Sequence, residues 1–228
     1  MIAISRKENY GTIHLMVLGK QEQEQEQEQE QDKGDSLPEH YRLMTTQITG
    51  IAEDRIYLLN QTHGDKIDNT ASAGIWEEGD GLYTTEKDRV LVIKTADCMP
   101  VFIWSRERPL IANIHSGWRG LQNGIVEKFV REVLRPGEKA AAYIGPCISQ
   151  GEYEIGEEVA KYFKQSNSLQ KHTKEKYLFG LRERQAEILR GYSSIELEMD
   201  TTCTRTSENY FSHRAGDKGR NLNLIWMS

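Results

Sequence analysis

The sequence predicts an α/β (α+β) fold, in which a mixed β-sheet packs with helices in a single domain. The chain has 228 residues and is 37% hydrophobic, which suits one large core better than two small ones. Short apolar runs typical of buried strands alternate with segments that carry a helical apolar stripe. One connection between two such runs is too short for a parallel crossover, so we expect the sheet to be partly antiparallel.

A low-complexity segment interrupts the first part of this predicted domain, which spans residues 1–228. Gln and Glu alternate over residues 21–31, and no apolar residue follows until Leu37. Without apolar side chains to bury, residues 20–36 are predicted to be a solvated insertion, with a frayed helix as the alternative. Ser36 is a suitable N-cap for a short helix that we expect to end near Gln47.

The remaining elements follow in order after Arg55. We predict strands at residues 56–59, 90–93, 101–104, 110–114, 141–144 and 195–199. Apolar residues at helical spacing from Trp118 to Val133 predict one helix, which Pro136 and Gly137 stop. A second helix is predicted over residues 177–190, ending at Gly191.

Composition excludes several classes of protein. The formal net charge is -6 and the basic residues form no long block, which argues against binding to nucleic acid. No apolar run approaches membrane-spanning length, and residues 13–18 are too short for a signal-peptide core, so we expect a soluble, cytoplasmic protein. The odd number of cysteines indicates free thiols, and we interpret Cys147 and Cys203 as small core residues.

Three predicted strand ends each lead to a residue that binds borderline metals. His63 and Cys98 lie just beyond strands, and His115 directly follows another. Their separations of 35 and 17 residues are much longer than the paired short spacings of zinc fingers, so the whole fold would assemble the site. Two imidazoles and one thiolate leave a fourth position open on tetrahedral zinc, as in catalytic sites. Taken singly, each residue is more often structural than a ligand.

Six motifs occur in order between Asn60 and the C-terminus. They are NQTHGD around His63, GDGLYT from Gly79, TADCMP around Cys98, HSGWRG from His115, IGPCIS around Cys147 and FSHR from Phe211. Together they resemble the laccase-domain family of purine nucleoside phosphorylases, whose members were also described as polyphenol oxidases. The resemblance implies a mixed-sheet α/β fold and a catalytic zinc site at His63, Cys98 and His115.

The same resemblance implies phosphorolysis of adenosine, inosine, guanosine and S-methyl-5'-thioadenosine, with adenosine deamination in the same site. The partners would be these purine nucleosides and phosphate, and copper can replace zinc in vitro because it binds such ligands more tightly. The chain departs from the family at its N-terminus and at His213, where the family often has tyrosine. We interpret His213 as a solvated structural residue.

Further residues near the ligands are candidates for substrate binding. Gly117 and Arg119 suit a phosphate site at a helix start, although a tight turn and an ion pair would explain them equally well. Asn60 and Gln61 can present amides to base or ribose, or satisfy backbone groups instead. We interpret Trp118, within the apolar stripe, as a core residue.

Two carboxylates, Asp97 and Asp80, are candidates for moving a proton during deamination. The alternative is that either carboxylate orients a ligand imidazole, the role that we favour for Asp97.

Rival functions remain open from the residues alone. A multicopper laccase needs many imidazoles, whereas this chain has 6 His in total and no HxH pair. A metal-free cysteine hydrolase or deamidase would use Cys98 as nucleophile with His115 or His63 as base. A zinc-stabilised scaffold without activity would have a closed site. The sequence leaves the oligomeric state open, as monomer or homodimer.

Overall fold

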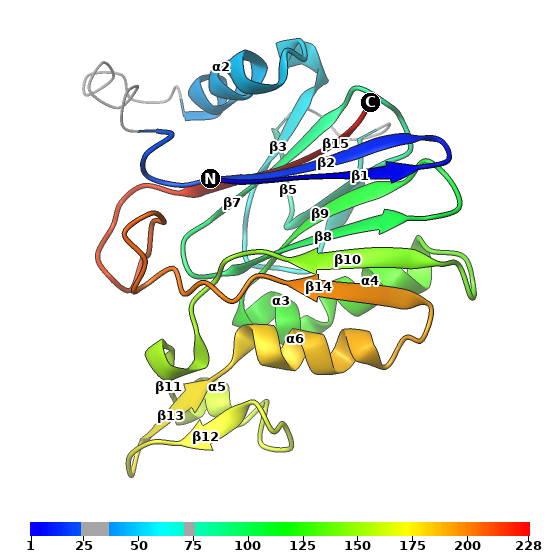
Figure 1. Cartoon of the computed structure of the whole chain (residues 1–228). Helices are drawn as coiled ribbons and strands as arrows, with labels where there is room; N and C mark the ends of the chain where they lie inside the picture. Colours follow the sequence, from blue (N-terminus) through cyan, green and yellow to red (C-terminus); the bar gives the residue numbers. More distant parts are fainter. Residues whose placement is uncertain (24–36, 71–75) are drawn as a thin grey trace.

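The computed structural model describes residues 1–23, 37–70 and 76–228. Two six-stranded sheets form the centre of the molecule and a three-stranded sheet lies at one end (Figure 1). Both large sheets contain parallel and antiparallel strand pairs. This confirms the predicted mixed α/β fold, with two large sheets where one was expected.

The first sheet has the strand order β1-β2-β15-β7-β3-β5. The pairs β1-β2, β2-β15 and β15-β7 are antiparallel. The pairs β7-β3 and β3-β5 are parallel. The strand bounds are β1 (Ile2–Glu8), β2 (Gly11–Leu18), β3 (Ile56–Asn60), β5 (Trp76–Glu78), β7 (Val90–Thr95) and β15 (Asn221–Met227).

The second sheet has the order β14-β10-β8-β9-β6-β4 and is antiparallel except at its two edges, where β10 pairs with β14 and β4 with β6 in parallel. Its strands are β4 (Ile67–Asn69), β6 (Gly81–Thr84), β8 (Met99–Ser105), β9 (Ile111–Ser116), β10 (Ala140–Ile144) and β14 (Ile195–Met199). The small third sheet has the order β11-β13-β12, with β11 (Glu154–Gly156), β12 (Leu169–Lys171) and β13 (Lys176–Phe179).

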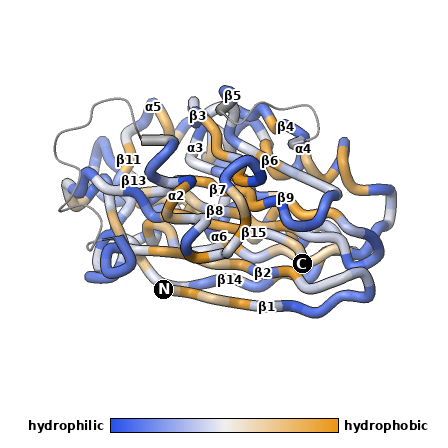
Figure 2. The backbone as a smooth tube through the Cα atoms, turned by 90° about the horizontal axis from the view of Figure 1, so that it is seen from above, coloured by the Kyte–Doolittle hydropathy of each residue, from blue (hydrophilic) through white to orange (hydrophobic). Residues whose placement is uncertain are grey.

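The two large sheets pack against each other and bury one hydrophobic cluster between them. On β7, Leu91 and Ile93 belong to this cluster, and on β8 Phe102 and Trp104 do. The alternate residues of both strands face away from it and are also buried. Because both faces of these strands are covered, their sequences are continuous apolar runs without polar alternation. In Figure 2 the interior strand segments are correspondingly hydrophobic, while many loops and edges are hydrophilic.

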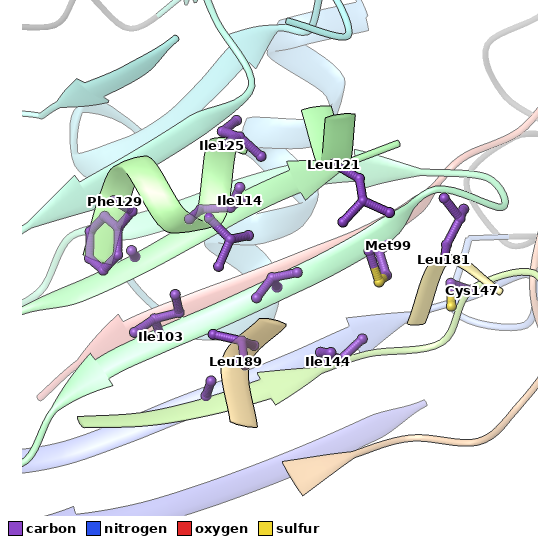
Figure 3. Packing of buried hydrophobic residues seen from close by; sticks show 14 of the residues in the cluster. Met99, Ile103, Ile114, Leu121, Ile125, Phe129, Ile144, Cys147, Leu181 and Leu189 are labelled. Atoms are coloured by element: carbon purple, nitrogen blue, oxygen red, sulfur yellow. The ribbon is translucent and has the colours of Figure 1, made fainter. Parts of the chain in front are cut away.

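Helices cover the outer faces of both sheets. Helix α2 (Leu37–Thr49) packs on the first sheet through Tyr41 and Met44. The outer face of the second sheet is covered by α3 (Trp118–Asn123), α4 (Ile125–Glu132) and α6 (Leu181–Arg190), and a short α5 (Glu157–Ala160) also packs into this cluster. Figure 3 shows Leu121, Ile125, Phe129 and Leu189 from these helices against side chains of the strands. Cys147 is fully buried in the same cluster, as predicted, whereas Cys203 is only partly buried.

Several elements differ from the prediction. The predicted helix from Trp118 to Val133 is two helices, because Gly124 between them has φ 72°, a left-handed conformation that breaks the helix. The start of the predicted helix at residues 177–190 is strand β13, and the helix begins only after Gly180. The aromatic residues Tyr177 and Phe179 favour a strand, and tertiary pairing decides between the two conformations.

The strands on either side of Asp97 also differ from expectation, because β7 and β8 lie in different sheets. Their short connection therefore crosses from one sheet to the other and does not make an antiparallel pair. The N-terminal hairpin and β15 were not predicted.

Of the predicted insertion at residues 20–36, only residues 20–23 are described. Gln23 among them is buried and donates to the carbonyls of Leu18 and Arg220, so the insertion's start is packed against the protein. The predicted Ser36 cap lies outside the described residues, while α2 extends to Thr49, two residues beyond the predicted end. None of the described helices is long and apolar enough to cross a membrane.

Candidate metal centre and its cavity

The three predicted metal ligands come together at one end of the sheet sandwich. His63 follows β3, Cys98 lies between β7 and β8, and His115 is the penultimate residue of β9. Their ligand atoms all lie within 4.8 Å of one another, and the two imidazole rings meet edge to face with centroids 4.8 Å apart. Residues separated by as many as 52 positions thus converge because both large sheets end at this point.

Asp80 holds both imidazole ligands in place. Its Oδ1 lies 2.7 Å from Nδ1 of His115 and accepts the backbone N–H of His63 at 3.0 Å. Its Oδ2 accepts the N–H of Gly64 at 2.6 Å and the hydroxyl of Thr62 at 3.2 Å. Burial raises the pKa of Asp80, but the hydrogen bonds from His115 and the backbone outweigh this effect and lower it. A carboxylate on Nδ1 leaves Nε2 of His115 available to a metal, the usual arrangement around zinc.

Asp97 fixes the Cys98 loop and is not directed at an imidazole. Its oxygens accept the hydroxyl of Thr204 and the backbone N–H of Arg214, both at 2.7 Å. Its backbone carbonyl accepts the N–H of Ile148 at 3.0 Å, and its φ is 84°. The role that we favoured for Asp97, orienting a ligand imidazole, is therefore performed by Asp80, because Asp97 uses both oxygens to hold the loop.

Gly117 leaves the space that the cluster needs. A β-carbon at this position would lie 2.9 Å from Sγ of Cys98 and 3.6 Å from Cδ2 of His63. Its φ of -82° is accessible to any residue, so close packing, and not backbone conformation, explains the glycine. The following helix α3 has only six residues.

The electrostatics of the cluster favour an ionised thiol. Burial raises the pKa of Cys98, but the two imidazoles together outweigh burial and lower it to about 6. Burial lowers the pKa of His115, and the opposing effect of Cys98 and Asp80 raises it to about 9. A partly buried thiolate next to imidazoles is a ligand that zinc binds well.

The cluster borders a cavity of about 760 Å³. Although the whole chain is acidic, the described lining residues include five basic side chains and one carboxylate, Asp97. The basic residues are Lys94, Arg119, Arg214, Lys218 and Arg220. An apolar and aromatic part of the wall comes from Tyr41, Trp118, Ile148, Tyr153 and Leu181. The cavity thus combines features that suit an aromatic ligand and an anion.

Most of the predicted substrate-binding residues line this cavity. Asn60 and Arg119 are exposed there. Within the described part of the chain Arg119 forms no ion pair, which was the alternative to phosphate binding. The Arg119 guanidinium lies 4.4 Å from the ring centroid of Trp118. Trp118 is only half-buried and borders the cavity, so its assignment to the core was incomplete. Gln61 forms two hydrogen bonds of 2.8 Å with the backbone of Lys94 and so serves the backbone.

Other lining residues were missed or given no binding role. His213 is exposed, as predicted, and also borders the cavity. Arg214 lies within the FSHR motif, which was a signal for it, whereas no sequence pattern indicated Tyr153. Tyr153 comes from a turn that reaches the cavity only through tertiary packing.

The fold and this site define a class of mixed α/β proteins with a His, Cys, His metal-ligand cluster at the edge of a basic cavity. The chain belongs to the family described as multi-copper polyphenol oxidoreductase laccase, whose model matches residues 25–228.

Relatives in this family include proteins named purine nucleoside phosphorylase. The Shigella flexneri protein is 32% identical over 74% of this chain and 72% of its own length. The Haemophilus influenzae protein is 29% identical over 81% and 79%. The Rickettsia conorii protein is 39% identical, but the match spans only 47% of this chain and 46% of that protein.

Solved structures share the fold. A Neisseria meningitidis protein aligns over 99% of both chains with a TM-score of 0.79 and 22% identity. A hypothetical protein of Bacillus licheniformis aligns over 83% of this chain and 80% of its own, with a TM-score of 0.74 and 24% identity.

Proposed function

We propose that the protein is a zinc-dependent purine nucleoside phosphorylase that also deaminates adenosine in the same site. The proposed substrates are adenosine, inosine, guanosine and S-methyl-5'-thioadenosine, with phosphate as co-substrate. The observation that carries the proposal is the convergence of His63, Cys98 and His115 at the edge of a basic cavity. The names of the relatives support the phosphorylase part of the proposal.

The residues present fit a zinc ion. Two imidazoles and one thiol form a donor set that zinc prefers, and a fourth position remains for water or substrate. Asp80 fixes His115 through Nδ1, and Gly117 keeps the space beside Cys98 clear. When bound, zinc supplies Lewis-acid chemistry and makes water a better nucleophile at neutral pH.

Phosphorolysis breaks the bond between the purine nitrogen and C1' of ribose and forms a bond from C1' to a phosphate oxygen. The products are the free purine and ribose 1-phosphate, or 5-methylthioribose 1-phosphate when the substrate is S-methyl-5'-thioadenosine. The chain must hold the phosphate dianion beside the sugar and stabilise the departing base. Arg119 presents a guanidinium to the cavity without a carboxylate partner in the described structure, which suits phosphate. Trp118 and the apolar residues Ile148 and Leu181 suit the purine ring.

Two rival functions have specific difficulties. Only one group of three or more potential metal ligands occurs among the described residues, and a multicopper oxidase needs several coppers. A cysteine hydrolase using Cys98 agrees with its lowered pKa, but the thiol also faces a second imidazole, which a catalytic dyad does not require. If stoichiometric zinc protects Cys98 from alkylation, the hydrolase is excluded.

The decisive experiment incubates zinc-quantified protein with adenosine in the presence and absence of phosphate and identifies the products. We expect adenine and ribose 1-phosphate only with phosphate, and inosine in both conditions. Absence of the corresponding pentose 1-phosphate with every proposed nucleoside would contradict the phosphorylase assignment.

Replacing Arg119 separates the two reactions. Arg119→Ala is expected to raise the KM for phosphate and to depress phosphorolysis strongly, because a charge-assisted contact contributes roughly 1.5 to 3 kcal/mol. Deamination needs no phosphate and should change much less. Arg119→Lys should recover part of the loss, since a point charge cannot replace the planar guanidinium. Equal damage to both reactions would show that Arg119 supports the shared site and does not bind phosphate.

A further inference from the structure

Tyr153 has an unusual environment for a buried tyrosine. Its side chain is 8% exposed, belongs to the core cluster beneath the second sheet and packs against Phe179 with ring centroids 6.4 Å apart. The residue also lines the cavity. Its hydroxyl has no hydrogen-bond partner among the described residues. The hydroxyl oxygen is nevertheless not among the side-chain atoms that are both inaccessible to solvent and without a partner. The ring is therefore anchored in the core while the hydroxyl retains access to the cavity.

Two guanidinium groups share this wall with the phenol. The Arg214 guanidinium lies 4.9 Å from the ring centroid of Tyr153. Its Nη1 donates to the carbonyl of Glu154 at 2.8 Å, and its backbone N–H donates to Asp97. Arg214 is thus held in place by backbone contacts, and no carboxylate neutralises its guanidinium within the described structure. Arg119 is the second such cation, and it is close enough to influence the ionisation of Tyr153.

The Tyr153 hydroxyl and the guanidinium groups of Arg119 and Arg214 have no anionic partner among the described residues. The Tyr153 hydroxyl has no protein partner and has access to the cavity, so it is free to donate a hydrogen bond to a ligand or to water. Two guanidinium groups without carboxylates are likewise suited to a ligand with several negatively charged oxygens. Burial raises the pKa of Tyr153, and the neighbouring Cys98 and Asp97 add to this effect against the two arginines. The phenol therefore stays protonated at neutral pH and can donate its proton in a hydrogen bond.

We propose that Tyr153 and Arg214, together with Arg119, form the binding site for phosphate, with the Tyr153 hydroxyl donating a hydrogen bond to a phosphate oxygen. The proposal rests on the proposed function, because it specifies where the co-substrate binds in that site. It adds Tyr153 and Arg214 to Arg119, which the sequence already indicated as a candidate phosphate ligand. It also places phosphate against the wall formed by the core-anchored tyrosine.

The test measures phosphate binding and turnover separately. Isothermal titration of zinc-loaded protein with inorganic phosphate gives a Kd that does not depend on catalysis. Tyr153→Phe removes one oxygen that has no protein partner, so the fold and the zinc content should be unchanged. We expect its Kd and KM for phosphate to rise about tenfold, the size of one hydrogen bond to a charged group. The kcat for phosphate-independent deamination of adenosine should stay within about twofold of wild type.

Matched variants distinguish phosphate binding from a structural role. Tyr177→Phe is the control, because the Tyr177 hydroxyl donates to Glu157 on the surface, and it should leave the Kd for phosphate unchanged. Arg214→Gln should weaken phosphate binding more than Tyr153→Phe, since it removes a charge. Unchanged phosphate Kd and KM in Tyr153→Phe, or equal losses in phosphorolysis and deamination, would overturn the proposal.

The two proposals fail in different ways. If wild-type protein binds phosphate and Tyr153→Phe weakens this binding, the inference stands even if no ribose 1-phosphate forms. The phosphorylase assignment would then be wrong, and an anion site would remain. If wild-type protein releases ribose 1-phosphate but Tyr153→Phe has a normal KM for phosphate, the function stands and this inference is wrong.

Discussion

Asp80 links the two candidate imidazole ligands through hydrogen bonds. It accepts hydrogen bonds from the ring of His115 and the backbone of His63, which lie 35 and 17 residues from it in sequence. Such a carboxylate fixes both the tautomer and the direction of a ligand ring. At the residue scale, the geometry of the candidate metal site therefore depends on a side chain outside the proposed ligand set.

Asp80→Asn tests this dependence. An amide retains the size of the carboxylate but loses its charge. It also has only one oxygen, whereas the hydrogen-bond donors around Asp80 use both carboxylate oxygens. We expect the affinity for zinc to fall roughly 10- to 100-fold, the usual cost of losing a partner of a ligand. Competition with a chromogenic chelator measures the affinity. Asp65→Asn, at a half-exposed ion pair with Lys128, is the control and should bind zinc normally.

At the scale of single elements, the connection from β9 to α3 shows how packing selects a glycine. Gly117 has a backbone conformation open to any residue, but its α-carbon faces the sulfur of Cys98. We predict that Gly117→Ala forces Cys98 or the connection to shift, because a β-carbon would lie 2.9 Å from Sγ. Zinc affinity and turnover should both fall, at a cost in stability of about 1–3 kcal/mol.

The control for this substitution is Gly151→Ala. Apart from Gly151 itself and the adjacent backbone, no atom lies within 4 Å of a β-carbon built on this residue, so this variant should keep its zinc and its melting temperature. Metal content after gel filtration and thermal denaturation compare the two proteins. Full zinc occupancy and normal turnover in Gly117→Ala would show that the connection adapts to the extra methyl group.

The connection between α4 and β10 has a buried carboxylate that makes stability depend on pH. Glu138 is 3% exposed and accepts hydrogen bonds from the Ser105 hydroxyl, from Nε of Arg108 at 2.9 Å and from the N–H of Arg135 at 2.8 Å. Burial raises the pKa of Glu138, but these hydrogen bonds and the charge of Arg108 lower it overall. Its stabilising contribution is therefore complete above the unfolded pKa of about 4.3 and is lost as the pH falls through the lower folded pKa.

Glu138→Gln should therefore flatten the acid side of the stability profile. At pH 7 we expect the variant to be about 1–3 kcal/mol less stable than wild type, because buried donors lose a charged acceptor. Below about pH 4 the difference should shrink, since the wild-type carboxylate becomes protonated. Urea denaturation at a series of pH values measures both effects, with Glu132→Gln on the exposed surface as control. A constant difference across this range would contradict the assigned titration.

At the scale of the whole molecule, the ligand cluster joins the two large sheets. His63 and Cys98 follow strands of the first sheet, while His115 belongs to a strand of the second. A metal held by all three ligands binds the folded arrangement and not the separated segments, so it stabilises the fold by mass action. With a metal bound, the same cluster that is proposed for catalysis would also help to hold the two sheets together.

Metal removal should lower the melting temperature. Free zinc at 100 times its Kd adds about 2.7 kcal/mol, which corresponds to a rise of roughly 5–10 °C for a chain of this size. Cys98→Ala should lose most bound zinc and most of this rise, whereas Cys203→Ala should keep both. Thermal scans with and without chelator, together with metal analysis, measure the effect. Loss of zinc in Cys203→Ala with retention in Cys98→Ala would mean that the wrong thiol was chosen.

The sequence by itself determined the mixed α/β class, most of the buried strands and the three metal-ligand candidates. Strands covered on both faces, such as β7 and β8, have continuous apolar runs that are readable without a structure. The ligand candidates stood out because each followed such a run and because the surrounding motifs resembled one family. These signals are local, and for that reason one chain was sufficient to find them.

Only the tertiary structure decided which distant groups meet. The division of β7 and β8 between two sheets depends on pairing with strands far away in sequence, as does the choice of strand for Tyr177 to Phe179. The contact of Asp80, and not the favoured Asp97, with the His115 imidazole also depends on it, because Thr204 and Arg214 occupy the oxygens of Asp97. Tyr153 reaches the cavity through core packing that no local pattern records. Contacts between distant segments follow from the balance of burial and hydrogen bonding over the whole chain, which a local pattern does not contain.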